Sequence, residues 1–273
     1  MQEQNFFTAI KNYLAGLGEP IKNNIEFVLI SLLMMVCMYL IAFGFEKFIE
    51  KKTGVKFASE KTKVNKLVVM AMMSAVAVVL MYFEFPIPFI APSFYEMDLS
   101  EVPIMIGSFM LGPTAGVIME AVKVILKIFI KGTSTAFVGD FANFILGCAF
   151  VVPASILYHF KKSRKMAIIG LVTGALTLII AGMAMNAFYL LPKYSQLYGI
   201  PVDSFIAMGS KITPAIKDIY TFVALAVAPF NLVKSVSVGI ITMLLYKPLS
   251  KLIKYGVVRE KESKTNNQNA NRI

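Results

Sequence analysis

Seven apolar segments divide this chain and leave no room between them for a soluble domain of useful size. They cover about residues 25–45, 67–83, 102–111, 113–130, 137–160, 166–190 and 221–246. A helix that crosses a bilayer needs about 20 apolar residues, so the segment at 102–111 is too short to cross unless its flanks help. Hydrophobic residues make up 57% of the chain and charged residues 16%, whereas soluble domains carry about 25% charged residues. The pattern predicts an all-α polytopic membrane protein.

The charges between these segments predict their orientation. The net charge of +11 would suggest nucleic-acid binding in a soluble protein, but here the bases gather beside apolar segments. Residues 46–66 carry seven Lys against three Glu, residues 160–165 carry four bases and no acid, and residues 84–101 carry four acids and no base. Cytoplasmic loops collect Lys and Arg. We therefore expect a cytoplasmic C-terminus, and the loops at 84–101, 131–136 and 191–220 on the outside.

The two ends of the chain fall outside the main membrane domain. Within residues 1–24, apolar side chains at helical spacing indicate an amphipathic surface helix at 3–17 or a loosely ordered tail. Residues 25–63 are expected to form an extra transmembrane helix and a basic linker; a cleaved signal peptide is less favoured, because the Lys-rich stretch opposes translocation. The basic tail at 251–273 is predicted to be disordered and cytoplasmic.

Catalytic motifs are missing from the sequence. Walker A, HExxH, GxSxG and CxxC patterns are all absent, and the two cysteines, Cys37 and Cys148, lie in apolar segments without metal-ligand spacing. The lone His159 stands beside Lys161, where a solvated helix end is expected. We therefore predict a protein that is not an enzyme and needs neither metal nor cofactor.

Polar residues at membrane depth are the strongest indication of a binding site. Glu120 and Lys123 share a helical face with Lys127, and Asn231 shares one with Lys234. Such charges cost about 2.5–3.5 kcal/mol each on insertion scales and usually face a cavity or the bundle interior. Glu120 and Lys123 fit a structural ion pair as well as a functional site. For Asn231 and Lys234 a functional site is favoured, because no acid lies nearby in sequence.

A Pro-rich stretch at 85–95 is expected to lie over such a cavity. Its three prolines keep the stretch extended, and its Phe and Tyr residues are unusually apolar for an external loop. An ordinary short loop is the alternative. Small residues on the second segment, Ala71, Ser74 and Ala75, predict a smooth face that fits a partner helix or a neighbour in the bundle equally well.

The order of several motifs resembles the S components of energy-coupling-factor (ECF) vitamin transporters. These motifs are Phe-Pro-Ile-Pro-Phe at 85–89, Glu-Met-Asp-Leu-Ser-Glu-Val-Pro at 96–103 and Phe-Met-Leu-Gly-Pro-Thr-Ala-Gly at 109–116. Ile-Lys-Gly at 130–132, Gly-Asp-Phe-Ala-Asn-Phe at 139–144 and the pair Asn231/Lys234 point to the riboflavin-specific branch. The resemblance covers residues 64–250 and implies a six-helix substrate-binding bundle there, with the helix at 25–45 as an addition.

The resemblance also implies a site and partners. The expected riboflavin-binding residues are Asn186, Asn231, Lys234, Phe89, Tyr95, Met97, Asp98, Lys127, Gly132 and Thr135. Asn186, Asn231 and Lys234 would meet the polar edge of the flavin ring, since amides and an ammonium match its C=O and N–H groups. Ala71 and Ala75 match the family's docking motif for a transmembrane coupling protein, which two ATPases drive. The lipid bilayer of a bacterial cell is the expected location.

Other functions remain open at this point. The chain could serve another vitamin or flavin mononucleotide, and the 191–220 region with its three Lys could tolerate a phosphorylated flavin. It could be a stand-alone secondary transporter coupled through Glu120 or Asp140, or an intramembrane enzyme.

Overall fold

A computed structural model describes residues 25–54, 57, 63–246 and 248 of the 273-residue chain. The amphipathic helix expected at 3–17 and the tail at 251–273 lie outside the described residues. Each of the seven predicted apolar segments is helical within them. Among the described residues, five helices are long and apolar enough to cross a membrane: Phe27–Thr53, Val64–Tyr82, Val138–Phe160, Arg164–Tyr198 and Ile219–Tyr246.

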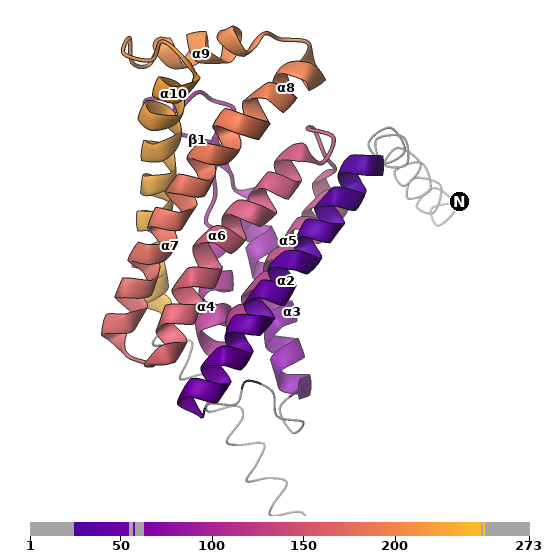
Figure 1. Ribbon diagram of the computed structural model, residues 1–273, viewed down its shortest axis with the longest axis vertical. Helices are drawn as coiled ribbons and strands as arrows, with labels where there is room; N and C mark the ends of the chain where they lie inside the picture. The colour runs from indigo at the N-terminus through magenta and orange to yellow at the C-terminus, as the bar shows by residue number, and fades with distance from the viewer. Residues whose placement is uncertain (1–24, 55–56, 58–62, 247, 249–273) are drawn as a thin grey trace, which may run out of the picture.

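The described helices form an elongated bundle (Figure 1). Helix α2 (Ile25–Thr53) packs on α5 (Pro113–Lys131) and α6 (Val138–Phe160), while α3 (Lys63–Tyr82) packs on α4 (Glu101–Leu111) and α5. Helix α7 (Arg164–Met185) lies against α6 along its length. The last long helix, Ile219–Tyr246, begins as α10 (Ile219–Phe222) and the π-helical turn η3 (Val223–Val227).

The short helix α4 is the centre of the bundle. Nine of its 11 residues are buried, including Ile104, Met105 and Phe109. The 11 residues of α4 span about 16 Å, roughly half of a hydrocarbon core, whereas the 19 residues of α5 span about 28 Å. The turn between them depends on Gly112, whose φ of +110° is open to glycine and strained for other residues.

The stretch between α3 and α4 is extended, as its prolines predict. Strand β1 (Phe85–Pro86) pairs antiparallel with β2 (Glu96–Met97), with Phe85 opposite Met97 and Pro86 opposite Glu96. This short hairpin lies at the end of the bundle that also carries α8 and α9 (Figure 1). It holds the residues between the two strands close to this end of the bundle.

The 191–220 region is not the plain loop that the sequence indicated. Helix α7 continues through the π-helical turn η2 (Asn186–Leu190) into α8 (Leu191–Tyr198), and α9 (Val202–Ser210) follows. In the π turn, the Leu191 N–H donates to the Asn186 carbonyl five residues earlier. This wider turn lets the helix run on into Pro192, whose missing N–H would break an ordinary helix interior.

One further prediction about a single residue is wrong, and the structure gives a second residue an environment that the sequence left open. His159 is buried instead of solvated: its Nδ1 lies 2.8 Å from the Ser155 carbonyl and its ring contacts Phe57. Ser74 is buried, which fits a neighbour in the bundle at this position, whereas Ala71 and Ala75 on the same helix are exposed. Both residues are placed by the packing of neighbouring helices, which the sequence of one helix does not reveal.

Candidate functional site

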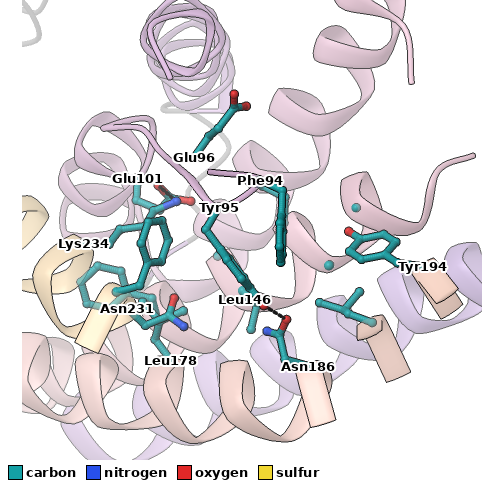
Figure 2. A pocket seen from close by; sticks show the side chains of 17 residues that line it. Phe94, Tyr95, Glu96, Glu101, Leu146, Leu178, Asn186, Tyr194, Asn231 and Lys234 are labelled. Carbon is teal, nitrogen blue, oxygen red and sulfur yellow. Dashed lines mark hydrogen bonds and ion pairs between the residues drawn. The ribbon is translucent and has the colours of Figure 1, made fainter. Parts of the chain in front are cut away.

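A cavity of about 170 Å³ lies beneath the hairpin, between α6, α7 and the last helix. Asn186, Asn231 and Lys234 line it from two different helices, and Phe94 and Tyr95 line it from the loop before β2 (Figure 2). These three polar residues, which the resemblance assigned to the polar edge of the ligand, therefore meet in one place. Apolar side chains complete the wall: Leu146, Phe150, Leu178, Leu190 and Phe230.

Asn186 is held at the start of the π turn with both ends of its amide engaged. Its Nδ2 donates to the Gly182 carbonyl at 2.8 Å, and its Oδ1 accepts from the Tyr95 hydroxyl at 2.5 Å. Because helix α7 continues into α8, Asn186 lies 12 residues before the helix end at Tyr198. The amide faces the cavity from the middle of a continuous helix.

Asn231 approaches the cavity from the last helix. Its Nδ2 donates to the Val227 carbonyl at 3.1 Å, and the side chain is buried. A Cβ atom at Gly182 would lie 2.5 Å from this nitrogen, so the absence of a side chain at Gly182 makes room for the amide. The Gly182 carbonyl thus accepts a hydrogen bond from Asn186, and the missing side chain of Gly182 leaves room for the Asn231 amide.

Lys234 is paired, contrary to the expectation of a lysine without a nearby acid. Its Nζ lies 3.1 Å from Asp98 Oδ2 and 3.2 Å from Glu101 Oε2. These acids stand more than 130 positions away in sequence, and the fold brings them to the last helix. Burial by itself would raise the pKa of Asp98, but the Lys234 and Lys123 ammonium groups and hydrogen bonds from Ser100 lower it to about 2. Asp98 is therefore a carboxylate at neutral pH.

A second cavity of about 450 Å³ adjoins the first. The two share the lining residues Phe94, Glu96, Gly139 and Asn143. Three residues that the resemblance implied line this second cavity: Lys127, Gly132 and Thr135. The Lys127 ammonium is 2.5 Å from Asp140 Oδ1, and Lys131 pairs with Glu84 at the rim.

The remaining expected residues do not line either cavity. Phe89 is 78% exposed on the hairpin, and Met97 is buried in an apolar cluster with Ile87 and Phe222. Asp98 does not line the first cavity, but it accepts a hydrogen bond from Lys234, which does.

Sequence reasoning did not select Glu101, Asn143, Tyr194 or Phe230 as site residues, although all four line the first cavity. Glu101 and Asn143 belong to the motifs at 96–103 and 139–144, so the resemblance carried a signal for them. Tyr194 comes from α8, which the sequence had placed in an external loop.

Comparison with known proteins decides the family. Residues 65–246 match the model for the substrate-specific component of ECF transporters. This chain belongs to that family. It is 34% identical over 191 residues to the riboflavin transporter RibU of Staphylococcus aureus, covering 70% of this chain and 93% of the relative. It is 32% identical over 185 residues to the riboflavin transporter FmnP of Bacillus subtilis, covering 67% and 91%.

The similarity to a solved structure, that of the S component of a bacterial ECF transporter, agrees with this family assignment. This structure superposes with a TM-score of 0.56 at 33% identity, covering 70% of this chain and 99% of the solved one. The family match begins inside α3, so α2 lies outside it. This ECF S component is therefore a multi-pass membrane protein from a transporter family and not from an enzyme family.

Proposed function

We propose that this S component captures riboflavin from outside the cell for ATP-driven uptake by an ECF transporter. The observation that carries the proposal is the convergence of Asn186, Asn231 and Lys234 on one cavity covered by Phe94 and Tyr95. Relatives about 30% identical over most of the chain are named riboflavin transporters, which supports the same substrate.

The chemistry of the first cavity suits an isoalloxazine ring. Amide side chains donate and accept, and so match the alternating C=O and N–H groups of the pyrimidine edge. The apolar wall around Leu146 and Phe150 suits the dimethylbenzene end, and Phe94 can stack on a ring face. A volume of 170 Å³ is below the roughly 300–1,000 Å³ of small-molecule sites. The ring therefore enters when Tyr95 moves aside, and the ribityl chain takes the adjoining second cavity.

The charge of the second cavity favours riboflavin over its phosphate. Its ionisable lining residues are Glu84, Glu96, Asp140, Lys127 and Lys131, three acids against two bases. Both lysines are paired with lining acids. A phosphate there would meet an excess of negative charge, whereas ribityl hydroxyls can bond with either type of group.

We further propose a six-helix S-component bundle at residues 64–250 with α2 as an added seventh crossing. The basic stretches then lie in the cytoplasm of a bacterial cell, with the C-terminus. The hairpin and both cavities then open to the outside. Ala71 and Ala75, which are exposed on α3, are the proposed contact for the transmembrane coupling protein of the ECF module. Two ATPases of that module supply the energy.

A purified sample tests the proposal directly. The protein alone should carry a yellow flavin chromophore or bind added riboflavin, and it should hydrolyse no ATP. Riboflavin mononucleotide should compete at least ten times more weakly than riboflavin. In vesicles, riboflavin uptake should require the coupling protein and both ATPases. Proton-driven accumulation by this protein alone would contradict the proposal and favour a secondary transporter.

A further inference from the structure

Five ionisable side chains form one buried cluster behind the first cavity. They are Asp98, Glu101, Glu120, Lys123 and Lys234, and each is less than 10% exposed. The Lys123 ammonium lies 3.1 Å from Glu101 and 2.8 Å from Glu120, while Lys234 bridges Asp98 and Glu101. Figure 2 shows Glu101 and Lys234 together at the cavity wall. The cluster joins the segment before α4 to α4, α5 and the last helix.

The cluster contains one more acidic side chain than basic side chains. Three carboxylates against two ammonium groups would leave a full negative charge in the bundle. Lys127, one turn along α5 from Lys123, pairs with Asp140, and Lys66 of α3 pairs with Glu46. Helix α6 faces Glu120 with Cys148. An uncompensated buried charge costs several kcal/mol, and buried acids avoid this cost by taking a proton.

Hydrogen bonding identifies the acid that is least stabilised as an anion. Asp98 accepts from the Ser100 N–H at 2.7 Å and from Lys234. Glu101 accepts from Lys123 and from the Ser100 hydroxyl. Neither oxygen of Glu120 has a hydrogen bond of good geometry among the described residues, although Lys123 is close to one of them.

The surroundings of Glu120 are also the most restrictive. Its exposed fraction is zero. A Cβ atom at Gly147 would lie only 2.5–2.6 Å from the three atoms of the carboxyl group, so α6 closes tightly over it. Water therefore has no room to stabilise a charge on this side.

We propose that Glu120 is a proton-binding site that holds one proton at neutral pH and leaves the cluster without net charge. This goes beyond the proposed function and does not depend on it. Because Glu101 and Lys234 also line the first cavity, the proton on Glu120 sets the net charge of the cluster at this part of the cavity wall. A cluster without net charge suits an uncharged ligand.

Infrared spectroscopy of the purified protein tests the proposal. A protonated carboxylic acid has a C=O stretching band above the amide I band, and a carboxylate does not. We expect such a band in the unaltered protein at neutral pH, equivalent to one acid per chain. It should disappear in Glu120→Gln, which keeps the shape and neutrality of the acid. It should persist in the control Glu50→Gln, which removes a carboxylate paired with Lys47 on α2.

A second pair of variants tests whether Glu120 holds a proton because the cluster contains more acids than bases. Glu101→Gln and Asp98→Asn each remove one negative charge, so Glu120 should ionise and the band should be lost although Glu120 is present. Two variants are used because either one could fail to fold. Absence of the band from the unaltered protein, or its persistence in Glu120→Gln, would overturn the proposal. Persistence in the folded Glu101→Gln or Asp98→Asn protein would overturn it as well.

Discussion

The hydroxyl of Tyr95 lies 2.5 Å from Oδ1 of Asn186, a hydrogen bond that joins the hairpin region to the π turn of α7. The other end of the same amide is bound to the Gly182 carbonyl. One amide hydrogen and one lone pair of Oδ1 are thus engaged within the protein, out of the two of each that the Asn186 side chain offers. A ligand that donates to Oδ1 from the direction of the Tyr95 hydroxyl must displace Tyr95, so Tyr95 competes with the ligand for this part of the site.

We predict that Tyr95→Phe binds riboflavin more tightly. The variant removes the competing hydrogen bond, which is worth about 0.5–1.5 kcal/mol, or about two- to twelve-fold in Kd. Titration of flavin fluorescence measures the change. Tyr198→Phe is the matched control, because its hydroxyl bonds to Ser134 and does not line the first cavity. Weaker binding by Tyr95→Phe would mean that the hydroxyl contacts the ligand.

Asn231→Ala should weaken riboflavin binding. Without the amide, a polar edge of the ring would be buried without a partner, at a cost of about 1–3 kcal/mol, or about five- to 150-fold in Kd. Ser235→Ala on the same helix is the control, since its hydroxyl returns to the Leu232 carbonyl. Unchanged affinity in a folded Asn231→Ala protein would place the ring elsewhere.

Lys234 is expected to matter for stability as well as for binding. Lys234→Met leaves Asp98 and Glu101 short of one ammonium group, and breaking such a buried pair costs about 3–5 kcal/mol. The thermal unfolding midpoint should therefore fall sharply. Asp98→Asn added to Lys234→Met should recover much of the loss, because it restores the charge balance. No recovery in the double variant would show that the two side chains do not act as a pair.

The sequence predicted the helices and part of the site for clear physical reasons. Apolar length determines the spans. The resemblance selected Asn186, whereas Asn231 could be selected because polar residues at membrane depth are costly enough to indicate function. Lys234 was selected for the same reason, but its partner could not be, since contacts across more than 130 positions depend on packing. Tyr194 was missed because a single π turn decides whether the helix passes Pro192.

The exposed face of α3 should be needed for uptake and not for binding. Bulky side chains at Ala71 and Ala75 would keep a partner helix at a distance. Ala71→Leu with Ala75→Leu should abolish uptake in vesicles that contain the full module, while riboflavin affinity stays within about twofold of the original. Ala184→Leu, an exposed alanine on α7, is the matched control. Loss of binding in the α3 variant would indicate that this face packs within the protein.

Glu46 should stabilise the attachment of the extra helix α2. Its Oε2 accepts from the Thr114 N–H at 3.1 Å in the first turn of α5, and its Oε1 is 3.9 Å from the Lys66 ammonium on α3. A carboxylate at a helix N-terminus contributes about 0.3–2 kcal/mol.

Glu46→Gln keeps the size but removes the charge, so the thermal unfolding midpoint should fall. Riboflavin affinity should stay unchanged, because Glu46 lies beside Gly112 of the α4–α5 turn and lines neither cavity. Lys47→Gln, at the surface beside it, should alter neither quantity. An unchanged midpoint in Glu46→Gln would show that α2 is held by apolar packing on α5 and α6 alone.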